Sequence, residues 1–283
     1  MRKASITELP TPTVEFDGPE PESSALVVIG GLLTIKQLSP LYMPLLKLDK
    51  TSSGPAHKRF VPPPQRGLGT VAGMTTELNT TLLRLHERHG KKLDLVGHSL
   101  GALMAMLATL ENPDIVASAT FIGGAHEGIK KETAATTALR RAVGNPPEAA
   151  LLQHDSGFMD EQHARVASDW PADVPMYVYA TVLDELIVPP QGFGLRPLGH
   201  VPADMGLITP RAPGLRFLAH RMLRDAPEEV KVIPTLYPAE HINLVRCPEV
   251  LGRVALHRSA MPANLMSETD PALSQSLAAP AAG

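Results

Sequence analysis

Cysteine is nearly absent from this sequence, whose 283 residues include only one, Cys247. A single cysteine cannot form an internal disulfide, and it cannot build a metal site made of several cysteines. Long hydrophobic runs are missing as well, because no uncharged apolar stretch approaches the roughly 18 residues of a membrane-spanning helix. We therefore expect no disulfide scaffold, no cysteine-rich metal site and no transmembrane segment.

An excess of charge of one sign is also absent. The formal net charge is −3 at pH 7 and lysine and arginine form no dense stripe, so we expect no nucleic-acid partner. Residues 1–20 contain no apolar segment of the kind found in signal peptides, so the sequence predicts a cytoplasmic protein unless a leader has been removed. What is present is ordinary for a globular protein, with 43% hydrophobic and 19% charged residues in a chain long enough for one large domain.

The two ends of the chain differ from its middle. Residues 1–24 are rich in proline and acidic residues, and residues 259–283 in alanine, proline and serine, so both are predicted to be disordered tails. Residues 25–258 form the predicted domain. Within it, residues 127–174 and 190–229 are too long to be simple connections, and segments of this kind often cover or shape a site. We interpret residues 127–174 as a helical, lid-like insertion.

Strand-like and helix-like patterns alternate through the predicted domain. Apolar runs rich in β-branched residues are the expected strands, at residues 25–31, 93–97, 116–124, 176–183 and 230–237. Helical spacing of apolar residues marks three further segments, at residues 69–90, 99–113 and 247–258. Strands that are apolar on both faces and alternate with helices imply a mostly parallel sheet. The sequence thus predicts an α/β fold of about six strands, with helices on both faces and no additional strands before Ala25.

One short motif lies at the junction of an expected strand and an expected helix. Residues 97–101 read Gly-His-Ser-Leu-Gly. In a nucleophile elbow the serine occupies a sharp strand-to-helix turn, whose strained backbone and close neighbours leave no room for side chains at the two glycines. The alternative is a serine that only caps the helix. Because of the strand and helix around it, we interpret Ser99 as a candidate nucleophile, with Gly97, His98 and Gly101 completing the elbow.

A serine hydroxyl becomes a nucleophile when a base takes its proton and an acid orients that base. In folds with this elbow the acid and the histidine follow later strands, in the order serine, acid, histidine. Asp184 directly follows the expected strand at 176–183, and His241 follows the one at 230–237. Both therefore fall at the carboxyl ends of strands, where functional residues of open parallel sheets gather. We predict Asp184 as the acid and His241 as the base.

Competing residues fit these two roles less well. Glu185 adjoins the predicted acid, but its neighbours suggest that it points the other way, and Glu240 reads as a solvated charge. The competing histidines fall in expected helices or in the insertion at 190–229: His220, His257 and His200.

The tetrahedral intermediate of acyl transfer needs two backbone N–H groups, one of them from the residue after the nucleophile. That residue is Leu100. The second N–H is expected from the loop after the first strand, where Gly30 and Gly31 precede Leu32. The two glycines also fit an ordinary turn. We predict Leu32 and Leu100 as the oxyanion hole.

With these residues placed, the sequence resembles the α/β-hydrolase superfamily and is most like bacterial triacylglycerol lipases and related esterases. The elbow at 97–101 matches the Gly-His-Ser-x-Gly of those lipases, and Asp-Glu-Leu-Ile-Val-Pro-Pro at 184–190 matches their acid segment. Looser similarities lie in the oxyanion loop at 30–32 and in Gly123–Gly128. The resemblance covers about residues 25–258.

The resemblance implies a serine hydrolase that cleaves carboxylic esters through a Ser-His-Asp triad and an acyl-enzyme. Its partner would be a small-molecule ester or acyl substrate, and it would need no cofactor and no metal. A thioesterase or an acyltransferase would use the same machinery, and a non-catalytic binding protein of this fold is the alternative from another class. Two positions depart from the lipases, since Gly30 stands in place of a histidine and Ala125 in place of a proline.

An apolar stretch follows the first expected strand. Six large apolar or aromatic residues lie close together in it: Leu38, Leu41, Tyr42, Met43, Leu45 and Leu46. They are either core residues or the wall of an acyl pocket, because the site of such a fold lies at this edge of the sheet.

Overall fold

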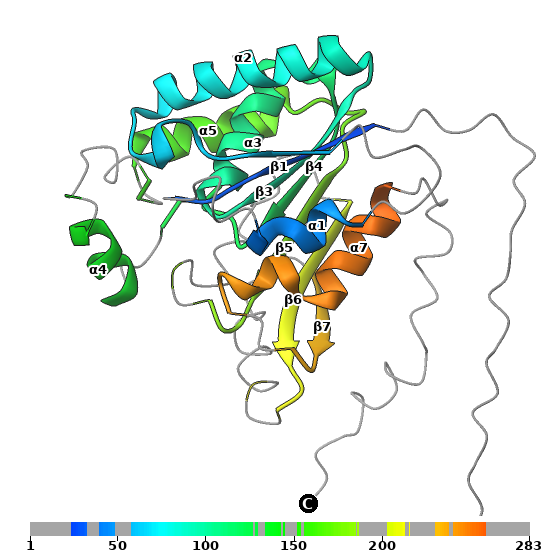
Figure 1. The fold of residues 1–283 in the computed structure, drawn as a ribbon. Coiled ribbons are helices and arrows are strands. Elements are labelled where there is room, and N and C mark those ends of the chain that lie inside the picture. Colours follow the sequence, from blue (N-terminus) through cyan, green and yellow to red (C-terminus); the bar gives the residue numbers. More distant parts are fainter. Residues whose placement is uncertain are drawn as a thin grey trace, which may run out of the picture.

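A computed structural model describes most of the predicted domain (Figure 1). The described residues are 24–32, 40–48, 58–126, 128–129, 134–142, 144, 152–153, 156–184, 186, 203–212, 215, 230–237 and 240–258. The tails predicted at residues 1–24 and 259–283 lie outside this part of the chain, apart from Ser24, and so does much of the insertion predicted at 190–229.

The described part of the chain contains one parallel sheet of seven strands (Figure 1). The strands are β1 (Ala25–Ile29), β2 (Lys58–Val61), β3 (Leu93–His98), β4 (Val116–Ile122), β5 (Met176–Thr181), β6 (Asp204–Pro210) and β7 (Val230–Thr235). Their order is β2-β1-β3-β4-β5-β6-β7, and every neighbouring pair is parallel. The carboxyl ends of all the strands therefore meet at one edge of the sheet.

Both faces of the sheet are buried. Alternate residues of a strand face opposite sides, so Ala25, Val27 and Ile29 of β1 belong to the core on one face. Leu26 and Val28 belong to the core on the other face. A strand buried on both faces reads as a continuous apolar run, which is the pattern that predicted this strand.

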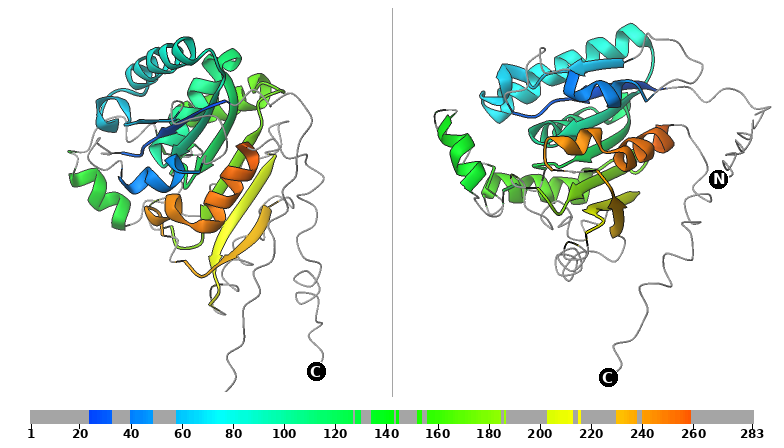
Figure 2. Two further views of the ribbon diagram at one scale, coloured as in Figure 1. Left: turned by 45° about the vertical axis from the view of Figure 1, so that its right-hand side comes forward. Right: turned by 60° about the horizontal axis from the view of Figure 1, so that its bottom comes forward.

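Helices form a layer on each face of the sheet (Figures 1 and 2). One face is covered by α2 (Val71–His89), α3 (Leu100–Glu111) and α5 (Gly157–Asp169), and the other by α1 (Met43–Leu46) and α7 (Pro248–Arg258). Short 3-10 helices include η3 (Pro64–Gly67), η4 (Pro113–Ile115) and η8 (Asn243–Arg246). Because α3 contacts α2 and α5 as well as the sheet, it is buried on nearly every side, as its uniformly apolar sequence indicates.

The fold confirms the predicted class, with two strands that were not individually expected. β2 has four residues beginning Lys58-Arg59 and lies at the edge of the sheet, so its sequence carries little apolar signal. β6 lies inside the stretch at 190–229, which reads as an insertion in the sequence, and Gly206 interrupts its apolar run. A Cβ at Gly206 would lie 2.3 Å from Cδ1 of Ile233 and 3.0 Å from Cδ1 of Tyr179, so the side chains of the two neighbouring strands pack over this glycine.

The segment at 127–174 divides into two parts. α5 belongs to the helix layer, because Met159 and Val166 are buried in the core beside α3. α4 (Ala134–Ala142) lies at the margin of the molecule, away from both helix layers, in all three views of Figures 1 and 2. Among the described helices of this segment, α4 is therefore the candidate for the predicted lid-like element.

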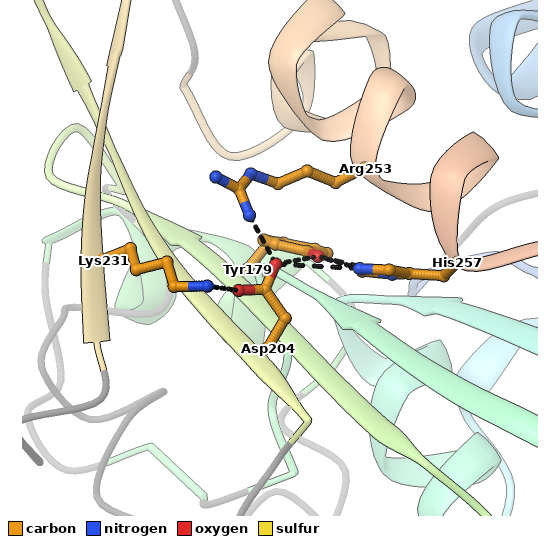
Figure 3. Close-up of polar contacts among 5 residues, drawn as sticks. All are labelled: Tyr179, Asp204, Lys231, Arg253 and His257. Carbon is orange, nitrogen blue, oxygen red and sulfur yellow. Dashed lines mark hydrogen bonds and ion pairs between the residues drawn. The ribbon is translucent and has the colours of Figure 1, made fainter. Parts of the chain in front are cut away.

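A buried polar cluster joins the last strands to α7 at the amino ends of the sheet (Figure 3). Asp204, the first residue of β6, accepts hydrogen bonds from the hydroxyl of Tyr179 (2.8 Å), Nζ of Lys231 (3.1 Å) and the guanidinium of Arg253 (2.6 Å). The ring of His257 lies 3.7 Å from the same carboxylate. Burial raises the pKa of Asp204, but these donors outweigh burial and hold its pKa below the usual value.

Candidate active site

The order of the strands creates a switch point in the sheet. From β1 the chain passes to β2 on one side, and it then returns to β3 on the other side of β1. Connections that leave neighbouring strands in opposite directions open a crevice at the carboxyl ends, where ligands of open parallel sheets bind. Gly31 and Leu32 follow β1, and Ser99 follows β3, so all three residues lie at this switch point, at the carboxyl ends of the two strands.

Ser99 occupies the turn between β3 and α3 in a strained conformation. Its φ is 56° and its ψ is −124°, and it makes no capping hydrogen bond to the helix that it precedes. A residue in such a region costs on the order of 1–3 kcal/mol and persists only where its surroundings enforce it. Here the Ser99 N–H donates to the carbonyl of Ile122 (3.1 Å), and the Ser99 carbonyl accepts from the N–H of Ala125 (3.1 Å). These bonds fix the turn against the end of β4.

The glycines on either side of the serine allow three backbone segments to come close together. A Cβ at Gly97 would lie 2.3 Å from the carbonyl oxygen of Gly101 and 2.6 Å from Cα of Ala102. A Cβ at Gly101 would lie 2.3 Å from the carbonyl oxygen of Ile29 and 2.6 Å from that of Gly30. Gly97 therefore allows α3 to approach β3, and Gly101 allows α3 to approach the end of β1.

The predicted acid and base lie beside each other. A parallel bridge between Leu183 and Glu240 brings the loop after β5 against the loop after β7. Asp184 follows Leu183 in the first loop, and His241 follows Glu240 in the second. Nδ1 of the histidine lies 2.8 Å from Oδ2 and 3.0 Å from Oδ1 of the carboxylate. Both residues are buried, with 6% and 2% of their surface exposed.

The hydrogen bonds of Asp184 determine how His241 can act. Oδ1 of the carboxylate also accepts from the N–H of Leu186 (2.9 Å). Because carboxylate oxygens accept hydrogen bonds, the proton of a neutral His241 lies on Nδ1 and the lone pair lies on Nε2. The pair thus has the arrangement of a base that is oriented by an acid.

Gly123 connects this pair to the serine turn. A Cβ at Gly123 would lie 3.4 Å from Oδ2 of Asp184 and 3.4 Å from Nδ1 of His241. From the other side, the ring centroid of His98 lies 4.9 Å from that of His241. The structure therefore joins Asp184 and His241 directly, and it places the partly exposed Ser99 in the same group of loops.

The two residues predicted for the oxyanion hole both lie at the serine turn. Leu100 is the first residue of α3, and the first N–H groups of a helix have no partner within the helix. Leu32 follows Gly31, where a Cβ would lie 2.9 Å from Cβ of Ser99, so the loop after β1 contacts the serine. The side chains of the two leucines meet at Gly67, because a Cβ there would lie 3.0 Å from Cδ1 of Leu32 and 2.7 Å from Cδ2 of Leu100.

Two features of this site carry little signal in the sequence. Tyr42 and Leu45, left open between core and pocket wall, are both buried in the core beside α7, and the Tyr42 hydroxyl contacts Nδ1 of His98 at 3.0 Å. Within η3, Gln65, Arg66 and Gly67 have positive φ, of 51°, 59° and 78°, and Gly67 adjoins the side chains of the predicted oxyanion residues. The sequence offers only the glycine as a signal for this conformation.

The competing residues have different places. Glu240 is exposed, and His257 lies in α7 at the opposite edge of the sheet from Ser99. Glu185, His200 and His220 lie outside the described residues.

Two histidines near the site are buried and uncharged at neutral pH. Burial lowers the pKa of His98 to about 3, and the nearby charge of His241 acts in the same direction. Burial, with a smaller contribution from His163, lowers the pKa of His126 to about 3. Within the described part of the chain, neither ring nitrogen of His126 has a hydrogen-bond partner.

The described residues include no group of three or more His, Cys, Asp or Glu side chains that could hold a metal ion. No helix among them is both long and apolar enough to cross a membrane.

Comparison with known proteins finds similarity in three dimensions only. No protein-family model and no curated protein sequence matches the chain. Among solved structures, naproxen esterase from Bacillus subtilis matches with a TM-score of 0.49 and 16% identity, over 85% of this chain and 84% of that one. A monoacylglycerol lipase of Paleococcus ferrophilus matches with a TM-score of 0.44 and 16% identity, over 84% and 96% of the two chains. Lipase B of Aspergillus fumigatus matches with a TM-score of 0.46 and 14% identity over 59% of this chain, which spans only 39% of that lipase.

The class of the fold follows from the architecture of the chain itself. The parallel sheet is covered by helices on both faces, and its switch point lies between β1 and β3. At that point a strand passes into a buried helix through a serine turn, as it does in hydrolases built on such a sheet. The described chain has the α/β-hydrolase fold.

Proposed function

We propose that this protein is a serine hydrolase that cleaves carboxylic esters. The observation that carries the proposal is the buried hydrogen bond between Asp184 and His241 beside the strained turn of Ser99. A carboxylate, a histidine and a serine that converge from three different strand ends are what acyl transfer through a serine requires. A structural role alone gives no reason for the positive φ of the serine.

In the proposed mechanism Ser99 Oγ attacks the acyl carbon while Nε2 of His241 takes its proton. Asp184 holds the Nδ1–H of His241 and stabilises the imidazolium that forms. The N–H groups of Leu32 and Leu100 bind the tetrahedral oxyanion, each worth about 10²- to 10³-fold in rate. The intermediate collapses, the alcohol leaves with the proton from His241, and water then hydrolyses the acyl-enzyme by the same steps.

Labelling with a fluorophosphonate probe tests the nucleophile directly. We expect one equivalent of probe on the wild-type protein, on the peptide that contains Ser99, and none on Ser99→Ala. Ser168→Ala is the matched control, because this exposed serine lies on α5 and donates its hydrogen bond to the carbonyl of Ala164. That variant should label fully. A wild-type protein that does not label, or that labels elsewhere, would refute the proposal in favour of a non-catalytic binding protein.

Kinetics with p-nitrophenyl esters test the base and the acid. His241→Ala and Asp184→Asn should each lower kcat by several orders of magnitude and leave the unfolding midpoint within a few degrees, because the three groups act as a unit. If His241→Ala keeps most of the activity, the base is another histidine, and His200 is the next to test. Acyl thioesters of matched chain length, and an alcohol acceptor added to the ester assay, separate an esterase from a thioesterase and an acyltransferase.

A further inference from the structure

A chain of three hydrogen bonds connects the loop after β1 to the loop after β7. The N–H of Gly31 donates to the hydroxyl of Tyr42 (3.2 Å), and that hydroxyl lies 3.0 Å from Nδ1 of His98. Nε2 of His98 lies 3.0 Å from the carbonyl oxygen of His241. Tyr42 and His98 are 3% and 4% exposed, so bulk water cannot readily replace either partner.

The direction of every bond in this chain follows from the chemistry of its end groups. A carbonyl oxygen only accepts, so the proton of the neutral His98 ring lies on Nε2 and points to the carbonyl of His241. Nδ1 of His98 is then an acceptor, and the Tyr42 hydroxyl that lies 3.0 Å from it must donate to it. The oxygen of Tyr42 is left to accept from the N–H of Gly31. One arrangement of protons thus satisfies all three bonds.

Rigid secondary-structure elements hold Tyr42 and His98, the middle of this series of hydrogen bonds, in place. His98 is the last residue of β3, and Tyr42 immediately precedes α1. The ring of Tyr42 stacks on that of Phe60 in β2, with centroids 4.9 Å apart and planes 28° from parallel. Neither side chain can therefore adjust easily if one of the bonds is lost.

Gly31 and His241, the two ends of this series of hydrogen bonds, lie on opposite sides of the proposed nucleophile Ser99. Gly31 contacts Ser99 and precedes the proposed oxyanion residue Leu32, whereas His241 is the proposed base. We propose that Tyr42 and His98 are positioning residues, which fix the oxyanion loop and the backbone of His241 at a set separation around Ser99. This inference rests on the proposed function, because it assigns a role within the same site.

Tyr42→Phe tests the proposal by removing one oxygen while keeping the ring that stacks on Phe60. With a short p-nitrophenyl ester, we expect kcat per labelled active site to fall about 10- to 100-fold, which raises the barrier by about 1.4–2.7 kcal/mol. KM should change less than twofold, because the groups displaced act mainly in the transition state. The inhibition constant of a trifluoromethyl ketone should rise by the same factor as kcat falls, and that of the corresponding alcohol should not change.

Tyr179→Phe is the matched control. It also removes one buried hydroxyl, which donates to the carboxylate of Asp204, the first residue of β6, and takes no part in the hydrogen bonds from Gly31 to His241. Both variants should lose thermal stability, but only Tyr42→Phe should lose kcat and affinity for the trifluoromethyl ketone. Equal kcat in the two variants, or a rise in KM without a fall in kcat, would overturn the positioning role.

Substitutions of His98 test the second bond. His98→Gln keeps an amide N–H that can reach the carbonyl of His241, whereas His98→Leu keeps neither bond. The glutamine variant should retain at least tenfold more kcat per labelled site than the leucine variant, and equal loss would count against the proposal.

Nitrogen-15 NMR measures the protonation of the His98 ring without an activity assay, and the inactive variant Ser99→Ala can be used for it. His98 should show a protonated Nε2 and a bare Nδ1, with no titration above about pH 4. An Nδ1–H form would overturn the hydrogen-bond chain itself. A protein whose His98 ring carries its proton on Nε2 but which hydrolyses no ester would confirm the series of hydrogen bonds. It would refute the proposed function and the positioning role together.

Discussion

Two glycine-to-alanine substitutions in helices should have opposite effects on stability. Gly101 lies in the first turn of α3, where an added Cβ would be 2.3 Å from the carbonyl oxygen of Ile29 and 2.6 Å from that of Gly30. An ordinary contact begins at 3.4 Å, so β1 and α3 must separate by about 1 Å. Gly252 lies in α7, and an added Cβ there would meet nothing within 4 Å.

The magnitudes follow from these contacts. Overpacking typically costs about 1–3 kcal/mol, and a clash with backbone atoms, which cannot rotate away, lies at the upper end of that range, from which the helical preference of alanine returns about 1 kcal/mol. Gly101→Ala should therefore lower the free energy of unfolding by about 2 kcal/mol. Gly252→Ala should raise it by about 0.5–1 kcal/mol, because only the helical preference changes.

Equilibrium unfolding in urea measures both effects, with a common m-value as the check that the unfolded states are alike. Esterase activity per labelled site supplies a second measurement. Gly101→Ala should lose kcat because it moves Ser99 relative to the loop after β1, whereas Gly252→Ala should keep it. A Gly101→Ala protein as stable as the wild type would show that α3 does not contact the end of β1 as described, and the elbow interpretation would then be wrong.

Three further predictions concern pH, charge and substrate. Burial lowers the pKa of His98 and His126 to about 3 and that of His257 to about 4. As the pH falls below about 6.5, these histidines therefore take up protons in the unfolded chain but not in the folded one. Each histidine should then remove about 1.4 kcal/mol of stability per pH unit down to its folded pKa, and urea midpoints of His126→Leu should fall less steeply with pH than those of the wild type. Asp204→Asn leaves the cations of the polar cluster without their counter-ion and should lower the free energy of unfolding in urea by about 3 kcal/mol. The kcat per labelled site should not change, because the cluster lies at the amino ends of the strands. A stability loss below about 1 kcal/mol would contradict this prediction. If an apolar acyl pocket adjoins Ser99, kcat/KM for p-nitrophenyl esters should rise roughly three- to fourfold per acyl carbon, because each buried CH₂ contributes about 0.8 kcal/mol. The maximum should fall at medium chains, and a maximum at acetate would refute the pocket.

The sequence by itself determined the features that depend on neighbouring residues along the chain. Continuous apolar runs specify strands buried on both faces, and the uniformly apolar stretch after Ser99 specifies α3. Gly97 marks the turn because its missing side chain is a local steric requirement, set by Gly101 and Ala102, whereas the space at Gly101 is limited by the distant Ile29 and Gly30. Asp184 directly follows a strand-like run and His241 lies in the loop after another, so the sequence alone places both at strand ends.

The tertiary structure alone decided the features that depend on distant segments. β2 and β6 are strands because of their places beside β1 and between β5 and β7, although a short edge strand and a glycine-containing run carry little pattern of their own. The hydrogen bond between Asp184 and His241 depends on the bridge between Leu183 and Glu240, which joins two loops separated by β6. Tyr42 reads as one more apolar residue in the sequence, but folding places its hydroxyl between Gly31 and His98. A hydrogen bond needs two partners within about 3 Å, and separation along the chain does not encode that distance.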